Sequence, residues 1–304
     1  MIRFEEIEIG YSKPLLFIPN LTLDAGKVYA LVGLNGIGKS TFLNSITGQT
    51  SLLSGKLFLN QQELQKISKV NLPKLIAYVD SSFAGVEYLT VFDYLALGRS
   101  PHTNNMGKLN TEDKQVIQEV VRELNLVHLI EKDTSEISDG ERQLCAVARA
   151  IIQSTPIILL DEPTAGLDPN QLIDIREVIK QLSTHSMVLF SSHILQEVTA
   201  VCNRVLVMHQ GTLVANEPIG ELLKPKTNHL HIQFEEDITH LQEHLHKLAI
   251  EIISIDKHLL VVKTAEGKDV KKIVMQFALD MGLNIERLHT EEASLEEIFK
   301  LLTH

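Results

Sequence analysis

The stretch Gly33-Leu34-Asn35-Gly36-Ile37-Gly38-Lys39-Ser40-Thr41 matches the phosphate-binding pattern G-x-x-x-x-G-K-[ST] at every fixed position. Residues 27–32 directly before it, Lys-Val-Tyr-Ala-Leu-Val, are predicted to form a short buried strand, and residues 41–46 can open a helix. A strand, a glycine-rich loop and a helix in this order are the context in which the motif binds phosphate. A chance Lys-Ser pair after a glycine-rich turn would lack this context.

Each part of this loop has a predicted chemical role. The glycines let backbone N–H groups converge on an anion, and the N-terminus of the following helix adds a partial positive charge. Lys39 can reach the β- and γ-phosphates of a nucleotide, and the Ser40 hydroxyl can ligate Mg²⁺. The predicted nucleotide contacts in this loop are Gly33, Asn35, Gly36, Gly38, Lys39, Ser40 and Thr41.

The composition is that of a folded protein of about two domains. The chain has 304 residues, of which 44% are hydrophobic and 22% charged. No apolar run reaches the roughly 18 residues that cross a bilayer, and residues 1–6 do not resemble a secretory signal. Cys145 and Cys202 are expected to be buried structural thiols in a reducing compartment. The net charge of −11 argues against nucleic-acid binding as the main function.

Residues 1–222 alternate short apolar strands with helical patterns, which predicts an α/β fold with a mostly parallel sheet. Candidate strands are residues 4–9, 27–32, 56–59, 75–79, 157–160, 187–191 and 205–208. Residues 85–153 lack a strong strand signal and are predicted to form a mainly helical subdomain within this domain. Thr111 is the expected N-cap of one of its helices.

A second domain is predicted at residues 228–304, after a boundary marked by Pro218, Gly220 and Pro225. Its expected strands are residues 229–234, 252–255, 259–263 and 283–288, and its expected helices are residues 238–248 and 270–281. The order β-α-β-β-α-β is that of a small α+β ferredoxin-like module. A last short helix is expected to begin at Ser294, where Glu297 would complete a capping box.

Two carboxylates follow the apolar residues 157–160. A buried strand that ends in Asp161 and Glu162 delivers acids to the sheet edge at which α/β proteins bind ligands. Asp161 suits the Mg²⁺ shell, directly or through water, and Glu162 suits activation of the attacking water as a general base. Alone, these acids would more simply be a solvated strand end, but the phosphate-binding loop upstream favours a catalytic role.

Residues 137–143, Ile-Ser-Asp-Gly-Glu-Arg-Gln, precede a long helical pattern. Here the chain resembles the ATP-binding-cassette (ABC) ATPases, whose signature is Leu-Ser-Gly-Gly-Gln. Ser138 and Gly140 match this signature, whereas Asp139 and Glu141 replace its first glycine and its glutamine. A serine hydroxyl and a glycine N–H at a helix N-terminus can clamp an anion, although an N-capped helix without a ligand has the same pattern. The resemblance implies nucleotide contacts by Ser138, Gly140 and Glu141, made to the ATP of a second, head-to-tail protomer.

Further positions follow the family order over residues 1–222. Tyr11 resembles the aromatic residue that stacks on adenine. Asp168 lies in a run similar to the family's D-loop, which crosses the dimer interface, and His193 resembles the switch histidine that contacts the γ-phosphate. The resemblance therefore implies an ATPase that uses ATP and Mg²⁺, with Glu162, His193 and Lys39 as its catalytic residues and with Ser40 and Asp161 on the metal.

One position departs from the family pattern. After the strand that corresponds to residues 75–79, the family has a glutamine that touches Mg²⁺ and couples the nucleotide state to the membrane partner. This chain has Asp80-Ser81-Ser82, and Ser81 aligns best with the missing glutamine. Ser81 or Asp80 could bind the metal through water, so the sequence leaves the role of this loop open.

The resemblance implies the ATPase subunit of a transporter, bound to the cytoplasmic face of the membrane through a separate permease. Residues 89–102 and the signature are similar to importers of siderophores, haem or cobalamin. Residues 166–169, 191–195 and 293–299 are similar to drug- and antibiotic-exporter ATPases with a C-terminal extension. Because this extension is the larger feature, we expect export, with import or a soluble, non-transport ABC ATPase as alternatives.

A zinc-peptidase pattern, H-x-x-E-H, is formed by His240, Glu243 and His244 in the second domain. On a helix, the two histidines would share one face. The pattern lacks an obvious third ligand, so a solvated polar helix face is the simpler interpretation.

Overall fold

The computed structural model describes residues 1–81, 83–104, 106–223, 229–245, 247–248, 250–263 and 269–290. Two compact units divide these residues, with Met1–Ile219 in the first and the residues from Gly220 onward in the second. Within the described ranges, no helix has the length and apolar character needed to cross a membrane. The helix expected at Ser294 and the exporter-like residues 293–299 lie outside these ranges.

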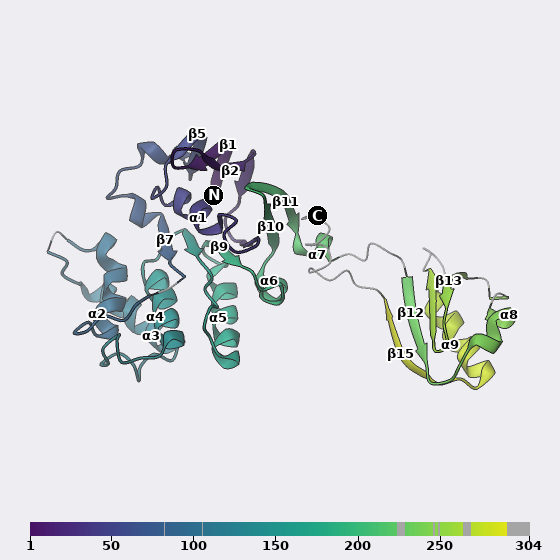
Figure 1. The fold of residues 1–304 in the computed structure, drawn as a ribbon. Coiled ribbons are helices and arrows are strands. Elements are labelled where there is room, and N and C mark those ends of the chain that lie inside the picture. Colours follow the sequence, from purple (N-terminus) through teal and green to yellow (C-terminus); the bar gives the residue numbers. More distant parts are fainter. Residues whose placement is uncertain are drawn as a thin grey trace. The chain divides into compact units, whose positions relative to one another are not determined.

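The first unit is built on a sheet of 11 strands in the order β6-β5-β1-β2-β11-β10-β4-β9-β8-β7, with β3 paired to β1 (Figure 1). The strands are β1 (Ile2–Gly10), β2 (Pro14–Ile18), β3 (Leu21–Leu23), β4 (Val28–Val32), β5 (Leu52–Leu59), β6 (Gln62–Glu63), β7 (Ile76–Val79), β8 (Ile157–Leu160), β9 (Met187–Ser192), β10 (Arg204–His209) and β11 (Thr212–Pro218). Strands β10, β4, β9, β8 and β7 are parallel neighbours, as predicted. The pairs that β1 makes with β2, β3 and β5 are antiparallel, so the sheet is mixed.

The parallel strands are the ones that the sequence predicted best, and their burial explains why. Every residue of β4, β8 and β9 is buried, so each strand is a continuous apolar or small-residue run. Strands β2 and β11 were not predicted, because exposed and buried residues alternate along β2 and no residue of β11 is fully buried. Neither segment therefore has the run of apolar residues from which a buried strand is predicted.

Helices cover this sheet and form the predicted helical subdomain. The helices of the first unit are α1 (Lys39–Ile46), α2 (Val91–Ala96), α3 (Thr111–Glu123), α4 (Asp139–Ile152), α5 (Pro169–Leu182) and α6 (Leu195–Val201), with 3₁₀ turns η1 (Leu64–Lys66), η2 (Leu72–Lys74) and η3 (Leu97–His102). In Figure 1, α2, α3 and α4 lie together on the side of the unit away from β1, β2 and β5. The N-cap of α3 is Asn110 and not Thr111, because Asn110 Oδ1 accepts the Asp113 N–H while Asp113 Oδ2 accepts the Asn110 N–H.

A buried ion pair anchors the helical subdomain. Arg99 Nε lies 2.8 Å from Asp113 Oδ1, and Arg99 Nη1 donates to the carbonyl of Ile152 at the end of α4. The next residue, Gln153, donates from Nε2 to the carbonyls of Pro73 and Ile76. The C-terminal end of α4 is therefore tied both to η3 and α3 and to the start of β7.

Cys145 and Cys202 are free and buried, as predicted. Burial raises the pKa of both thiols to about 12, which keeps them protonated and unreactive at neutral pH.

The second unit is a four-stranded antiparallel sheet in the order β13-β14-β12-β15. It begins at Gly220, within α7 (Ile219–Leu222), and its further elements are β12 (His229–Phe234), η4 (Thr239–Leu241), α8 (Gln242–Leu245), β13 (Glu251–Ile255), β14 (Leu259–Lys263), α9 (Val270–Met281) and β15 (Ile285–Thr290). The order of elements is the predicted β-α-β-β-α-β order. The helix expected at residues 238–248 is instead the 3₁₀ turn η4 followed by the short α8.

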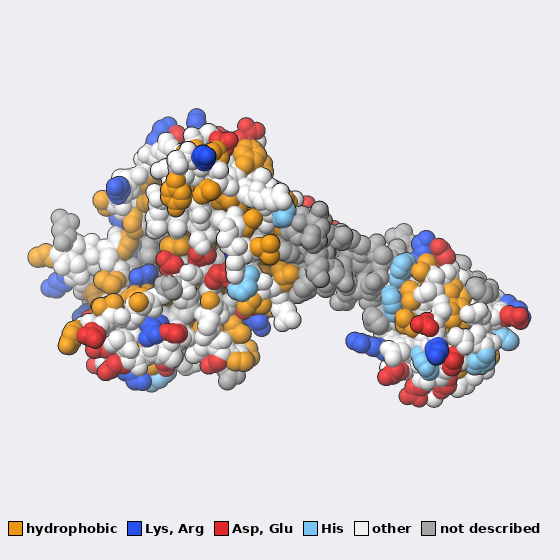
Figure 2. Space-filling view, viewed as in Figure 1, with side chains coloured by type: hydrophobic (Ala, Val, Ile, Leu, Met, Phe, Trp, Pro, Cys, Tyr) orange, Lys and Arg blue, Asp and Glu red, His pale blue; other side chains and the backbone are white. Residues whose placement is uncertain are grey.

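Histidines are spread over the visible surface of the second unit (Figure 2). His240 lies in η4, and Glu243 and His244 lie in α8. Among the residues that the structure describes, no group of three His, Cys, Asp or Glu side chains is placed to hold a metal ion.

Candidate functional site

The phosphate-binding loop connects β4 to α1 and is shaped by glycines. Gly36 and Gly38 have φ angles of 78° and 108°, in the left-handed region that favours glycine. A Cβ on Gly38 would also lie 2.6 Å from the Leu16 side chain, and a Cβ on Gly33 would lie 3.0 Å from the carbonyl oxygen of Met208. The loop therefore needs glycine at these positions to fold back over the sheet and begin α1 at Lys39. Asn35 is exposed at its tip, and Ser40 and Thr41 lie in the first turn of α1.

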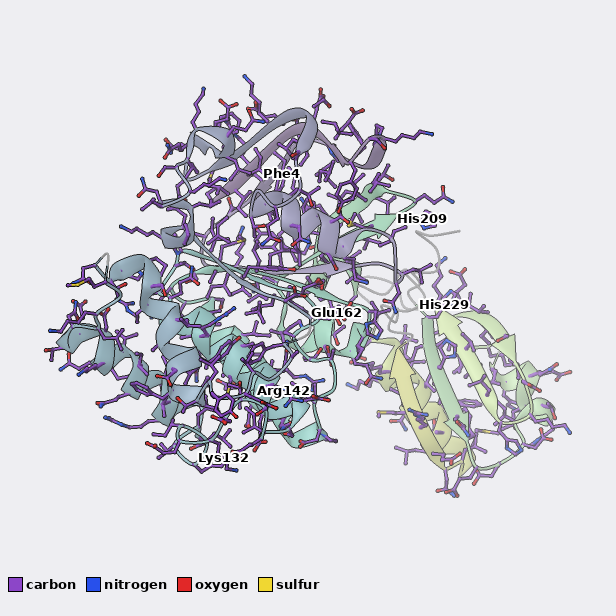
Figure 3. The ribbon with its side chains drawn as sticks, turned by 60° about the vertical axis from the view of Figure 1, so that its left-hand side comes forward. Phe4, Lys132, Arg142, Glu162, His209 and His229 are labelled. Carbon is purple, nitrogen blue, oxygen red and sulfur yellow. The ribbon has the colours of Figure 1, made fainter. Side chains whose placement is uncertain are left out.

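Sheet register brings the predicted catalytic residues to one edge. Val32 at the end of β4 pairs with Ser192 at the end of β9, and Leu160 at the end of β8 pairs with Phe190. The loops that follow β4, β9 and β8 therefore emerge side by side, at the carboxyl ends of parallel strands, where α/β proteins bind ligands. Figure 3 shows Glu162 at this edge, between the part of the unit that holds Phe4 and the part that holds Arg142 of α4 and Lys132.

Glu162 lies between two of the predicted catalytic side chains. Its Oε1 is 3.3 Å from Lys39 Nζ, and its Oε2 is 2.8 Å from His193 Nδ1. Lys39 is only 6% exposed, and its Nζ also donates to the carbonyl of Gly33 at 3.0 Å. The structure thus brings together Lys39, Glu162 and His193 from three separate loops. A carboxylate held beside an ammonium group can accept a proton from a water that attacks a phosphate bound in the loop.

Asp161 is buried next to this cluster and is fixed by Ser191. The Ser191 hydroxyl donates to Asp161 Oδ1 and accepts the Glu162 N–H at 2.8 Å. Asp161 is 2% exposed, whereas the hydroxyl-bearing Ser40 is exposed. A carboxylate and a hydroxyl are hard oxygen donors of the kind that Mg²⁺ prefers, so this donor set fits the metal.

Ser81 is exposed two residues beyond the end of β7, where the sequence left a metal contact open. Its N–H donates to Asp80 Oδ1 at 2.7 Å, and its hydroxyl points to the same oxygen at 3.3 Å. The two residues form a local turn, and this geometry assigns the metal to neither of them.

The signature residues begin α4 and form a closed capping box. Ser138 Oγ accepts the Glu141 N–H, while Glu141 Oε2 accepts both the N–H and the hydroxyl of Ser138 at 2.8 Å. The Ser138 N–H bond is the main cause of a lowered pKa at Glu141, so this carboxyl is ionised at neutral pH. Arg142 donates to the exposed Asp139. Within the described part of the chain, no hydrogen bond or ion pair joins Ser138 or Glu141 to the phosphate-binding loop.

Asp168 caps α5 and is linked to the signature through Gln171. Asp168 Oδ1 accepts the Gln171 N–H at 2.9 Å, and Gln171 Oε1 accepts the Asp168 N–H at 3.2 Å. The Gln171 side chain also covers Gly140, where an added Cβ would lie 2.2 Å from Gln171 Oε1. Gln171 of α5 therefore lies against Gly140 of the signature and is also hydrogen-bonded to Asp168 of the predicted D-loop. Tyr11 stands apart from all these contacts and is 74% exposed.

Sequence reasoning missed four residues that organise this site: Gln171, Ser191, Ser192 and Glu197. The spacing Asp168-x-x-Gln171 is a capping-box pattern and could have revealed Gln171. The other three lie in or after β9, where only the histidine had a recognised role.

Comparison with known proteins places the chain in a family. The model of a family described as "ABC transporter" matches residues 16–165. The molybdate import ATP-binding protein of Haemophilus influenzae is 34% identical over 193 residues, which are 63% of this chain and 71% of that protein. The chain belongs to the ABC transporter ATP-binding proteins. Its cassette is therefore an ATP-binding and ATP-hydrolysing domain.

Two further comparisons agree with this assignment. An uncharacterized ABC transporter ATP-binding protein of Methanocaldococcus jannaschii is 34% identical over 184 residues, which are 60% of this chain but only 63% of that protein's length. A solved structure of the ATP-binding subunit of an ABC transporter superposes with a TM-score of 0.66 over 73% of this chain and 91% of that one. At 24% identity, this second similarity concerns the fold.

Proposed function

We propose that this ABC cassette is the ATPase subunit of a transporter, working in pairs on the cytoplasmic face of a membrane and driving a separate membrane-spanning permease. The observation that carries the proposal is that the predicted site falls into two separate parts, one around Glu162 and one at the N-terminus of α4. Glu162 contacts both Lys39 and His193, whereas Ser138 and Glu141 at the start of α4 make no hydrogen bond or ion pair with the phosphate-binding loop in the described residues. A nucleotide bound at the loop would be completed by the α4 N-terminus of a second chain, arranged head to tail.

The proposed mechanism gives each side chain one task. Glu162 accepts a proton from the attacking water, and Lys39 offsets the negative charge that develops on the transferred phosphoryl group. His193, held at 2.8 Å from Glu162, orients that carboxylate and contacts the terminal phosphate. Tyr11 stacks on the base, and Ser138 and Gly140 of the partner clamp the terminal phosphate. Ser40 and Asp161 would hold Mg²⁺, whose charge neutralises phosphate oxygens.

The proposed domains are a cassette at residues 1–222, with its helical subdomain at 85–153, and an accessory domain at 228–304. The division of the chain into two compact units between Ile219 and Gly220 supports these boundaries. The accessory domain has no assigned ligand.

We propose import as the direction of transport. The molybdate protein, which carries import in its name, supports this direction, and the expected export finds no support in it. Export is the second candidate, because the β-α-β-β-α-β unit beyond the cassette is the kind of extension that suggested it.

Purification of the full-length chain from detergent-solubilised native membranes tests this proposal. We expect an integral membrane protein to co-purify in stoichiometric amount, with ATPase activity that rises when the complex is placed in proteoliposomes. The direction of transport is then decided by comparing uptake and efflux in cells that lack the protein with uptake and efflux in cells in which it has been restored. A stoichiometric partner set without any membrane protein would contradict the transporter proposal and favour a soluble ABC ATPase.

A further inference from the structure

Glu197 is a buried carboxylate on α6 that the proposed mechanism does not use. It is 2% exposed. Its Oε2 accepts hydrogen bonds from two hydroxyls, those of Thr164 and of Ser192, the latter at 3.3 Å. Burying a carboxylate is unfavourable unless its oxygens are hydrogen-bonded. The two hydroxyls are therefore what stabilises Glu197 in this position, and it in turn fixes both of them.

The two hydroxyls belong to the two loops that carry the proposed catalytic pair. Thr164 follows Glu162 by two residues, and Ser192 directly precedes His193. Ser192 Oγ also accepts the N–H of Ile194 at 3.0 Å, so this hydroxyl fixes the backbone on the far side of His193. Glu197 thus links the loop after β8, which carries Glu162, to the end of β9, which is followed by His193.

The backbone at Glu162 needs such support. Its φ angle of 46° is in the left-handed region, which is uncommon for a residue with a side chain. Such conformations persist only where the surrounding structure fixes them from several sides. Ser191 holds the Glu162 N–H, and the Glu162 carbonyl accepts the N–H of Ala165. The hydrogen bond from the Thr164 hydroxyl to Glu197 is a third contact, which ties this turn to the buried side of α6.

We infer that Glu197 is a positioning residue for ATP hydrolysis, which holds Glu162 against His193 by binding the hydroxyls of Thr164 and Ser192. Among the described residues, no hydrogen bond or ion pair joins Glu197 to the phosphate-binding loop, so we expect it to act through these two loops. The inference rests on the proposed role of Glu162 as general base.

The test compares ATPase kinetics of the full chain with those of Glu197→Ala and Glu197→Gln. A catalytic group displaced by about 1 Å can lose about 100-fold in rate, so we expect kcat to fall by about 10- to 100-fold for Glu197→Ala. KM for ATP should change by less than about 2-fold, because the residues of the phosphate-binding loop are untouched. Glu197→Gln retains an oxygen acceptor for Thr164 and should lose less.

A matched pair of threonine substitutions covers the case in which the Glu197 variants fold poorly. Thr164→Val removes the hydroxyl that binds Glu197, whereas Thr155→Val removes a buried hydroxyl that donates to the Ile157 carbonyl at the opposite end of β8. Both lose one buried hydrogen bond, but only Thr164→Val should lower kcat. Equal kcat in the two variants would overturn the inference.

A double-mutant cycle separates positioning from a general structural effect. If Glu197 acts through Glu162, adding Glu197→Ala to Glu162→Gln should cause no further fall in turnover. A further fall as large as that in the wild-type background would overturn the inference. Wild-type turnover in Glu162→Gln alone would instead contradict the general-base proposal. Loss in Glu162→Gln together with wild-type kcat in Glu197→Ala would contradict only the role of Glu197.

Discussion

The loops around Glu162 and the N-terminus of α4 are held in different ways. Around Glu162, the contacts are mostly buried and come from distant parts of the chain: Lys39 from α1, Ser191 from β9 and Glu197 from α6. At the start of α4, Ser138 and Glu141 satisfy each other locally, and the neighbouring Asp139 side chain is 85% exposed. Contacts within one chain therefore organise the region around Glu162. The N-terminus of α4 is instead capped locally and exposed, as expected for a surface that contacts another molecule.

The largest expected effect is that of Glu162→Gln on turnover. Loss of a general base typically costs about 100- to 10,000-fold, so phosphate release at saturating ATP should fall by at least about 100-fold. ATP binding should persist, because Lys39 and the glycine loop remain. If Glu162→Gln turned over ATP at the wild-type rate, the loops around Glu162 would not be the catalytic region.

Next in size is the effect of Asp113→Asn on the anchor of the helical subdomain, which carries the signature. Asp113 and Arg99 are both buried, and breaking a buried ion pair costs about 3 kcal/mol of unfolding free energy. Urea unfolding at pH 7 measures this loss. The exposed Asp174→Asn on α5 is the matched control and should change stability by less than about 0.5 kcal/mol.

The pH dependence of this stability follows from the sign of the pKa shift. The Asn110 N–H, followed by the Arg99 hydrogen bond, holds the pKa of Asp113 below its ordinary value of 3.8 in the folded chain. The ionised carboxylate therefore contributes stability above pH 3.8, and this contribution is lost as the pH falls through the lower folded-state pKa. The stability gap between wild type and Asp113→Asn should close over that acidic window. A gap that is constant with pH would contradict the assignment.

Lys39→Ala should weaken nucleotide binding by about 10- to 100-fold. A charge-assisted hydrogen bond to phosphate is worth about 1.5–3 kcal/mol, and about 1.4 kcal/mol corresponds to a tenfold change in affinity. Calorimetric titration with ATP measures this change, with the exposed Lys180→Ala on α5 as control. Undiminished ATP affinity would contradict the phosphate-binding role of the loop.

The smallest expected effect concerns the contact between the signature and the D-loop. A Cβ at position 140 would lie 2.2 Å from Gln171 Oε1, so Gly140→Ala forces the Gln171 side chain to move. Gly140 belongs to the helix N-terminus that is proposed to clamp the terminal phosphate. We therefore expect turnover to fall by about 10-fold, which corresponds to about 1.4 kcal/mol of activation free energy. The double variant Gly140→Ala with Gln171→Ala makes room and should recover most of that loss. Without recovery, Gly140 would be required for close approach to phosphate and not for packing on Gln171.

The sequence predicted those parts of the molecule in which local pattern determines structure. The buried parallel strands are apolar runs in the sequence, and the phosphate-binding loop and the Asp161-Glu162 pair each follow one of these runs. The α/β fold and the placement of these residues at one edge of the sheet could therefore be predicted from motif and topology. The contacts of Glu162 with Lys39 and His193 were not predicted, because the resemblance assigned His193 only to the γ-phosphate.

Features that depend on tertiary contacts could not be predicted in the same way. Strands β2 and β11 are stabilised by their neighbours, and their own patterns are weak. Glu197 reads as an ordinary polar residue of an amphipathic helix, and only the fold shows that it lies buried between two hydroxyls. The expected helix at 238–248 was wrong in extent, because η4 and α8 divide the segment into two short turns.

The measurement that tests the central claim most directly is the molar mass of Glu162→Gln in solution, by light scattering, with and without ATP and Mg²⁺. We expect a monomer without nucleotide and a dimer with ATP. Adding Ser138→Arg should abolish the dimer while the variant still binds ATP. A dimer that forms equally well with Ser138→Arg, or a monomer under all conditions despite bound ATP, would contradict the claim that a second chain's α4 completes the site.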